Sequence, residues 1–265
     1  SKLLKDKSER VLVVHKSRST ASSCLVHLIL DGLSGADEGR RGKGKELRFT
    51  PVFVVTEPAG DVEDRLRASG YEVHEENALL GVVPAAMPMF KSATAQEDYE
   101  RKARAKRWSD LAKEARCTKV MVADLMDDLA VELLCEVVQG RGAELGNMTA
   151  FAETKWGVTI VRPLQELSRE EVEAFHRLVF APATGEGEAA AATDGQSESS
   201  PVDRGRPAGA EATLQSLTAE FVLSLQRDFP ATVPTLWRTG TKLLTPEEAQ
   251  GTAGTGVEEH CVLCD

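Results

Sequence analysis

Five short segments with the pattern of β-strands recur along the chain, and helical or loop sequence follows each of them. They cover residues 11–14, 51–56, 71–75, 119–123 and 158–162. Strands that alternate with helices are typical of a mostly parallel sheet with helices on both faces. The sequence therefore predicts a doubly wound α/β fold.

Three helix starts are marked by a hydroxyl residue that Glu follows three positions later, a pattern in which the two side chains cap the first turn. They are Thr94 with Glu97, Ser168 with Glu171, and Thr245 with Glu248. A further helix is predicted where large apolar residues recur at helical spacing, and its apolar stripe is expected to pack on the core. The stripe consists of Leu214, Leu217, Phe221 and Leu225.

The composition between the helix that starts at Ser168 and the helix that contains Leu214 changes to Gly, Ala, Ser, Glu and Pro. Such a segment buries too little apolar surface to order itself, so we expect a disordered insert within one domain. The predicted organisation is an α/β domain over 1–183, the insert over 184–212, a C-terminal helical part of the same domain over 213–250 and a tail over 251–265.

Nucleic-acid binding needs clustered positive charge, so the net charge of −10 argues against binding over the whole protein surface. Basic residues do cluster locally, in a Gly-rich loop and on one predicted helix, although a solvated loop and a solvated helix face are the favoured explanation of these clusters. The clusters are Arg40, Arg41, Lys43 and Lys45, and then Arg101, Lys102, Arg104, Lys106 and Arg107. Dispersed cysteines and the lack of a long apolar run or cleavable signal predict a cytosolic protein without a membrane span.

The turn after the first strand has the frame of a phosphate-binding loop, because it joins a buried strand to a helix that begins near Ser22. It lacks the glycines that let a backbone approach a phosphate closely, and it contains no acidic residue. The polar candidates in this degenerate nucleotide pocket are Ser17, Ser19 and Ser22. The alternative is a Ser-rich N-cap on an ordinary α/β domain.

Three carboxylates, Asp124, Asp127 and Asp128, follow the predicted strand at 119–123. Ligands of open α/β sheets bind at the carboxyl ends of strands, so these side chains are candidates for a Mg²⁺ or nucleotide site. The alternative is that Asp is favourable at the start of the following helix on electrostatic grounds.

The sequence Gly140-Arg141-Gly142 ends that helix. Gly140 is expected to stop the helix. Arg141 between two glycines is a candidate for presenting its guanidinium to a phosphate, but the sequence favours the explanation that this segment is only the end of a helix. Cys24, Cys117 and Cys135 are predicted to be buried hydrophobic residues rather than nucleophiles.

The last residues include Cys261 and Cys264, which have the spacing of half a zinc site. We expect the chain to be a piece of a longer protein, and a zinc ion to be bound only where further ligands complete this pair.

Four blocks resemble the cytoplasmic tRNA 2-thiolation protein 2 family, a branch of the PP-loop ATP pyrophosphatases. They are residues 11–33, 119–143, 161–178 and 214–244, and the pair Cys261 and Cys264 follows them. The resemblance implies a PP-loop fold of the adenine nucleotide alpha hydrolase type. It also implies a cytosolic heterodimer with a catalytic thiolase paralogue, a ubiquitin-like sulfur carrier, and tRNA for Lys, Glu and Gln as the substrate of wobble-uridine 2-thiolation.

Two departures from the active relatives affect what is expected here. Active PP-loop enzymes carry Ser-Gly-Gly-x-Asp-Ser, and residues 16–21 keep none of it, so ATP is not expected as a cofactor. Sulfur-handling cysteines are missing from 81–116 and 163–238, whereas Asp127 and Asp128 match the family's Asp pair.

The resemblance and these departures together predict a non-catalytic subunit. RNA or phosphate contacts are expected at Gly140, Arg141, Gly142, Arg104, Lys106 and Arg107. Two alternatives are an ATP-dependent tRNA-modifying enzyme that uses Asp127 and Asp128, and a scaffold for the sulfur carrier without RNA contact.

Overall fold

A computed structural model describes residues 9–16, 18–34, 49–56, 61–76, 90–142, 145–180 and 212–242. Within them lies a six-stranded sheet of order β3-β2-β1-β4-β6-β5. The strands are β1 (Arg10–His15), β2 (Thr50–Val55), β3 (Glu72–Glu75), β4 (Lys119–Met121), β5 (Ala152–Lys155) and β6 (Val158–Val161). All neighbours are parallel except β5 and β6. The five predicted strands and the mostly parallel sheet are confirmed.

The sequence analysis missed β5, which forms an antiparallel hairpin with β6. Its sequence Ala-Glu-Thr-Lys has no apolar run, because an edge strand of this kind is covered on only part of its surface. Trp156 and Gly157 form the turn, with φ angles of 51° and 75°. Two successive positive φ angles are typical of the two-residue turns that fit the twist of a hairpin.

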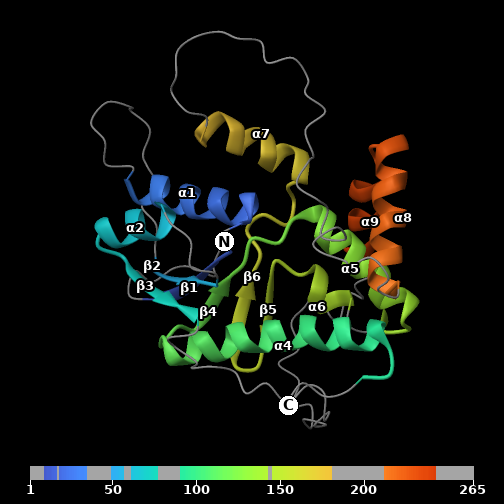
Figure 1. The fold of residues 1–265 in the computed structure, drawn as a ribbon, viewed down its shortest axis with the longest axis horizontal. Helices are drawn as coiled ribbons and strands as arrows, with labels where there is room; N and C mark the ends of the chain where they lie inside the picture. Colours follow the sequence, from blue (N-terminus) through green and yellow to red (C-terminus); the bar gives the residue numbers. More distant parts are fainter. Residues whose placement is uncertain are drawn as a thin grey trace.

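The helices lie on both faces of this sheet, as Figure 1 shows. They are α1 (Thr20–Ser34), α2 (Asp61–Ala68), α4 (Ala93–Glu114), α5 (Met126–Val138), α6 (Leu145–Thr149), α7 (Arg169–Phe180), α8 (Leu214–Asp228) and α9 (Thr232–Gly240). Helices α1, α2 and α7 cover one face, where Val13 and Phe53 pack with Leu66 and Val172. Helix α4 covers the opposite face.

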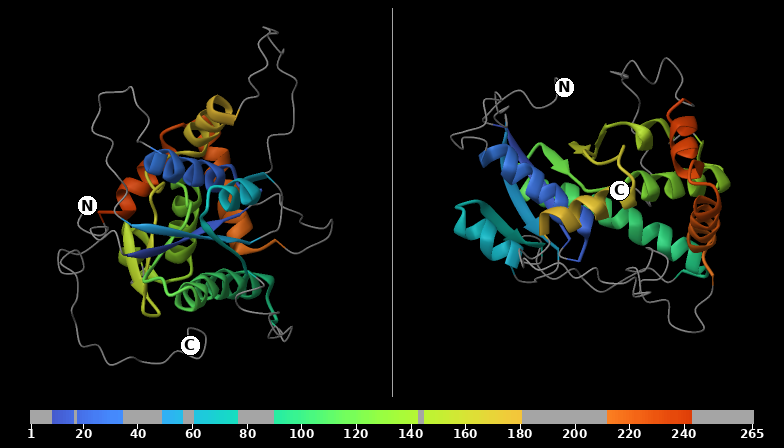
Figure 2. Two further views of the ribbon diagram at one scale, coloured as in Figure 1. Left: turned by 90° about the vertical axis from the view of Figure 1, so that its left-hand side faces the viewer. Right: turned by 90° about the horizontal axis from the view of Figure 1, so that it is seen from above.

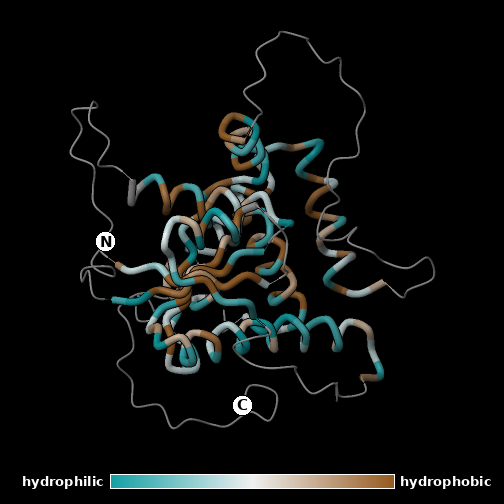
Figure 3. The backbone as a smooth tube through the Cα atoms, turned by 60° about the vertical axis from the view of Figure 1, so that its left-hand side comes forward, coloured by the Kyte–Doolittle hydropathy of each residue, from teal (hydrophilic) through white to brown (hydrophobic). Residues whose placement is uncertain are grey.

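Alternate residues of β1 and β2 point to these two layers. Leu12 and Val14 pack with Trp108 and Leu111 of α4, whereas Val11 and Val13 face α1. The hydrophobic strands therefore gather in the middle of the molecule (Figure 3). A near-continuous apolar run in each strand is what a parallel sheet buried on both faces requires.

Helices α8 and α9 form the predicted C-terminal helical part, which packs against α5 at one end of the molecule (Figure 2). Ala130 of α5 meets Val222 and Val233 of this pair. The prediction that the apolar stripe of α8 packs on the core was wrong, because Leu217 is 51% exposed and Phe221 is 57% exposed. The buried residues are instead Thr218, Ala219 and Val222.

The start of α8 explains this direction. Thr213 and Ser216 form a reciprocal capping box, and the Oγ1 atom of Thr94 on α4 accepts a hydrogen bond of 3.0 Å from the backbone N–H of Leu214. Helix α8 is thus fixed against both α4 and α5, and the face toward these helices is the small-residue face. The prediction that Thr94 caps α4 was wrong, since α4 begins at Ala93 after Ser92.

The second predicted helix start is confirmed. Ser168 Oγ accepts from the N–H of Glu171, and Glu171 Oε2 accepts from the N–H of Ser168 at 2.8 Å. The third, at Thr245, lies outside the described residues, as do the tail and, except for Ala212, the predicted insert. Among the described residues, no helix is long and apolar enough to cross a membrane.

Candidate functional site

The carboxyl ends of β1 and β4 meet at the centre of the sheet. The chain continues from β1 toward β2 and β3 on one side, and from β4 toward β6 and β5 on the other. The crossover connections therefore diverge between β1 and β4, which is the place where open α/β sheets bind ligands. Lys16, Arg18 and Ser19, which follow β1, and the start of α5 lie at this point.

The loop after β1 caps its own helix. The backbone N–H of Ser22 donates to Ser19 Oγ at 3.3 Å, and the N–H of Ser19 donates to the carbonyl of Lys16 at 2.9 Å. Ser22 is buried, and Ser17 lies outside the described residues. The geometry thus gives Ser19 the N-cap role that was the alternative interpretation of this segment.

His15 precedes this loop and is 1% exposed. Burial lowers the pKa of its imidazole, which favours the neutral ring beneath the turn. The Nδ1 atom makes no hydrogen bond to another described residue. A neutral, enclosed imidazole gives no positive charge to a phosphate at this position.

The two carboxylates of the predicted pocket both bind the start of α7. Asp127 Oδ2 accepts from the backbone N–H of Arg169 at 2.7 Å, and Asp128 Oδ1 pairs with the Arg169 Nη2 atom at 2.6 Å. Asp127 is 7% exposed, and its carboxylate accepts from one of the N–H groups that the start of a helix leaves without a partner inside the helix. The pair therefore joins α5 to α7 across the ligand edge of the sheet.

Asp124, the third carboxylate, faces Arg162 at the end of β6. The Arg162 Nε atom lies 3.5 Å from Asp124 Oδ2, and its Nη2 atom donates to Glu153 Oε2 at 2.8 Å. Arg162 is 8% exposed, and the sequence analysis assigned it no role. A cation at the last position of a predicted buried strand is the signal that would have identified it, because such a charge needs partners at that edge.

The residues at this edge do not fit ATP. A pyrophosphate needs backbone N–H groups that it can approach closely, and Lys16, Arg18 and Ser19 place side chains on the loop. The Nζ atom of Lys16 lies 5.0 Å from the centre of the Trp108 ring. Asp127 and Asp128, the candidate metal ligands, are engaged by Arg169.

Gly140 ends α5 as predicted. Its φ is +76°, and the N–H of Arg141 donates to the carbonyl of Glu136 at 2.8 Å, which closes a Schellman motif. The Arg141 guanidinium binds carboxylates, with Nη2 to Asp98 Oδ1 at 2.9 Å and further hydrogen bonds to Glu136. Gly142 is exposed beside it.

Arg141 belongs to a cluster that joins α4 to α5, which we call the α4–α5 charge cluster. Its members are Asp98, Arg101, Glu132, Glu136 and Arg141. Of the other predicted basic contacts on α4, Arg107 pairs with Glu76, Lys106 is half-buried and Arg104 is exposed. Along α5, about 6 Å of helix separates Glu132 of this cluster from Asp128, and about 12 Å separates Glu136 from it. Arg141 follows the other end of α5, so the predicted phosphate contact at Arg141 and the predicted carboxylate pocket lie at opposite ends of this helix.

The described cysteines are buried free thiols, as predicted. Burial raises the pKa of Cys117 to about 11, which keeps it protonated and unreactive at neutral pH. The described residues contain no group of His, Cys, Asp or Glu arranged to hold a metal ion. Cys261 and Cys264 lie outside the described residues.

Comparison with known proteins identifies the family. A family model described as "Cytoplasmic tRNA 2-thiolation protein 2" matches residues 213–265. A protein of that name from Danio rerio is 34% identical over 157 residues, which is 58% of this chain and 28% of the relative. The protein of the same name from Drosophila persimilis is 32% identical over 202 residues, covering 74% of this chain and 45% of that relative.

The chain belongs to the cytoplasmic tRNA 2-thiolation protein 2 family. It spans less than half the length of these relatives. A structure described as "U34-tRNA thiolase NcsA from Methanococcus maripaludis with its [4Fe-4S] cluster" has a similar fold, with a TM-score of 0.61 at 12% identity. The match covers 100% of this chain and 81% of NcsA. The predicted PP-loop fold is thus confirmed for this member of the tRNA 2-thiolation protein 2 family.

Proposed function

We propose that the chain is part of a non-catalytic subunit of a cytoplasmic tRNA 2-thiolation complex. The complex forms 2-thiouridine at the wobble position of the tRNAs for Lys, Glu and Gln. In it, a catalytic paralogue forms a heterodimer with this subunit, and a ubiquitin-like carrier supplies sulfur. The names of the relatives support the tRNA pathway and the cytoplasmic location.

The proposal that the subunit is non-catalytic depends on one observation, namely that Asp127 and Asp128 both bind Arg169. A carboxylate that holds Mg²⁺ or a nucleotide must turn its oxygens toward the ligand, whereas these two bind the backbone and the guanidinium of Arg169. The pair therefore supports the start of α7. The proposed function of this subunit is to stabilise the paralogue and to position tRNA. Arg104 and Arg141 are among its candidate RNA contacts.

The pathway is tested in cells that lack the gene for the full-length protein. We expect mass spectrometry of their tRNA to show that 2-thiouridine is lost from the three wobble positions, and the intact gene to restore it. A variant with Asp128→Asn should restore it as well, because Asp128 has no chemical role in the proposal. Unchanged 2-thiouridine in the deletion strain would refute the pathway, and failure of Asp128→Asn at normal protein abundance would favour the enzyme alternative.

ATP binding gives an independent prediction. Isothermal titration calorimetry of the purified protein with ATP and Mg²⁺ should show an affinity far weaker than micromolar, since the loop side chains occupy the approach to its backbone N–H groups. Removing the side chain of Lys16 with Lys16→Gly should not restore binding, because Arg18 and Ser19 remain. Micromolar, Mg²⁺-dependent affinity of the unmodified protein would contradict the prediction.

A further inference from the structure

Two residues other than Gly have a positive φ angle in the described part of the chain. They are Arg116, with φ of 54°, and Trp156, with φ of 51°. The left-handed conformation costs an L-residue free energy, and Gly, Asn or Asp normally occupies it. Bulky residues that keep such a conformation cluster at functional sites, so the observed outliers indicate where to look for one.

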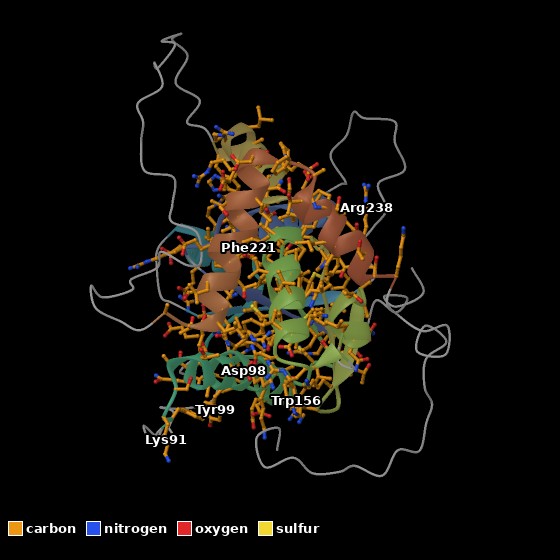
Figure 4. All side chains as sticks on the ribbon, turned by 90° about the vertical axis from the view of Figure 1, so that its right-hand side faces the viewer. Lys91, Asp98, Tyr99, Trp156, Phe221 and Arg238 are labelled. Atoms are coloured by element: carbon orange, nitrogen blue, oxygen red, sulfur yellow. The ribbon has the colours of Figure 1, made fainter. Side chains whose placement is uncertain are left out.

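Both residues lie at the same edge of the sheet, opposite to the carboxyl ends of the parallel strands. Arg116 is the residue after the C-cap of α4 in a Schellman motif, in which the N–H of Cys117 donates to the carbonyl of Ala112 at 2.7 Å, so the end of this helix accounts for its positive φ. Trp156 is in the turn that enters β6. These strands are neighbours, and the N–H of Thr159 donates to the carbonyl of Thr118 at 3.1 Å just beyond the two turns. In Figure 4, Trp156 lies at the lower end of the molecule, away from Phe221 of α8 and Arg238 of α9.

The charges around the two turns leave a positive balance. Glu9 pairs with Lys119, and Glu72 pairs with Arg10. Lys155, next to Trp156, makes no ion pair with another described residue, and neither does the exposed Arg116. The exposed Glu114, two positions before Arg116, also has no ion pair with a described residue, so these three groups leave one positive charge in excess.

The indole ring of Trp156 is half-buried, and the Lys155 Nζ atom lies 4.9 Å from its centre. An aromatic face beside a cation is the arrangement that proteins use to stack an unpaired base and to contact its phosphate. Hairpin stability does not require a Trp here, because Asn before Gly suits this turn better. The turn alone therefore does not explain a Trp at this position.

We infer that Trp156, Lys155 and Arg116 form a binding site for an unpaired nucleotide of RNA at the amino-terminal edge of the sheet. The indole stacks on the base, and the ammonium and guanidinium groups bind the adjoining phosphates. The inference rests on the proposed function for the identity of that RNA as tRNA. It adds a contact surface distinct from Arg104 and Arg141 on α4 and α5.

The decisive variant is Trp156→Asn in the full-length protein. Asn suits the turn, so the melting temperature should stay the same or rise, while the affinity for a fluorescein-labelled single-stranded U12 RNA at 50 mM salt should fall about tenfold. Trp156→Phe keeps an aromatic face and should retain most of the affinity. Equal affinity of Trp156→Asn and the parent protein would overturn the inference, as would weaker binding accompanied by a lower melting temperature.

Charge is tested with Arg116→Gly, because Gly tolerates the positive φ while the side chain with its guanidinium is removed. The slope of log affinity against log salt should decrease by about one. Lys113→Ala is the matched control, since Lys113 is exposed on the same helix end but faces Asp110 at 3.9 Å, and it should leave the slope unchanged. An unchanged slope for Arg116→Gly would remove Arg116 from the site.

These measurements are separable from the test of the proposed function. If the deletion strain keeps its 2-thiouridine while Trp156→Asn loses RNA affinity, the pathway fails and the RNA site remains. If thiolation depends on the gene while Trp156→Asn binds RNA as the parent does, the RNA site alone fails.

Discussion

Replacing Trp237 with Ala is expected to lower the free energy of unfolding by about 3–5 kcal/mol, the range for truncation of a buried aromatic side chain. Trp237 is 1% exposed on α9, and its Nε1 atom donates to Glu166 Oε1 at 3.4 Å. A Cβ atom at Gly240, one turn later, would come within 1.9 Å of Leu133 Cδ1. Helix α9 therefore packs tightly on α5, and a cavity there cannot close without moving both helices.

Urea denaturation followed by far-UV circular dichroism measures this loss. The control is Phe221→Ala on α8, which removes a ring that is 57% exposed and should cost less than about 1 kcal/mol. Comparable losses from both variants would show that α8 turns its aromatic face toward the core after all. A loss below 1 kcal/mol from Trp237→Ala would mean that α9 contributes little to the folded state.

The strands of this fold were predictable from sequence because a parallel sheet buries both faces. Val11 to Val14 form a continuous apolar run that suits no solvent-exposed element, and the same holds for the segment at 51–56. β5 carries no such signal. Its place is set by the turn at Trp156 and Gly157 and by its pairing with β6, which is tertiary information.

The face of α8 that packs inward was not predictable from apolar spacing alone. Two stripes of α8 have helical period, and the larger side chains of Leu217 and Phe221 favoured the wrong one. The face that packs inward is set in part by Thr94, whose hydroxyl accepts a hydrogen bond from the first turn of α8 although it lies 120 residues away in the chain. Small side chains such as Ala219 then allow the close approach of α5 and α8.

The candidate site was predicted in its location but not in its contacts. A Ser-rich turn after β1 and carboxylates after β4 had to meet at one edge of a parallel sheet, and they do. That Asp127 and Asp128 both bind Arg169 depends on where α7 begins, 42 residues later. The position of Arg141 was likewise predictable, because Gly140 indicated the end of the helix. Its contact with Asp98 on α4 was not, because nothing in the sequence pairs these two residues.

Removing the central cation of the α4–α5 charge cluster should cost about 3 kcal/mol at pH 7, the lower end of the range for breaking a buried ion pair. Arg101 binds Asp98 at 2.8 Å and also contacts Glu132 and Glu136, and 27% of its side chain is exposed. In Arg101→Ala, Glu136 stays buried with Arg141 as its remaining cation. The loss comes mainly from carboxylates whose charge is no longer balanced.

The same residues set the pH dependence of this loss. Burial raises the pKa of Glu136 and of Asp98, but hydrogen bonds and charges of Arg101 and Arg141, together with the charge of Lys102 beside Asp98, outweigh it, so both pKa values lie below their ordinary range. A folded-state pKa below the unfolded one stabilises the fold above the unfolded pKa, about 4 for these groups, and the benefit disappears as pH falls through the folded pKa. Arg101→Ala forfeits that benefit, so its deficit should shrink as the carboxylates protonate.

Urea titrations at pH 7.0 and pH 3.5 should therefore give a large deficit for Arg101→Ala at the higher pH and a smaller one at the lower. Lys113→Ala on the same helix is the matched control, because its contact with Asp110 is exposed and should be worth less than about 0.5 kcal/mol at either pH. An Arg101→Ala deficit that is equal at both pH values would show that the side chain acts through its packed methylene groups, since loss of packing does not depend on the protonation of Glu136.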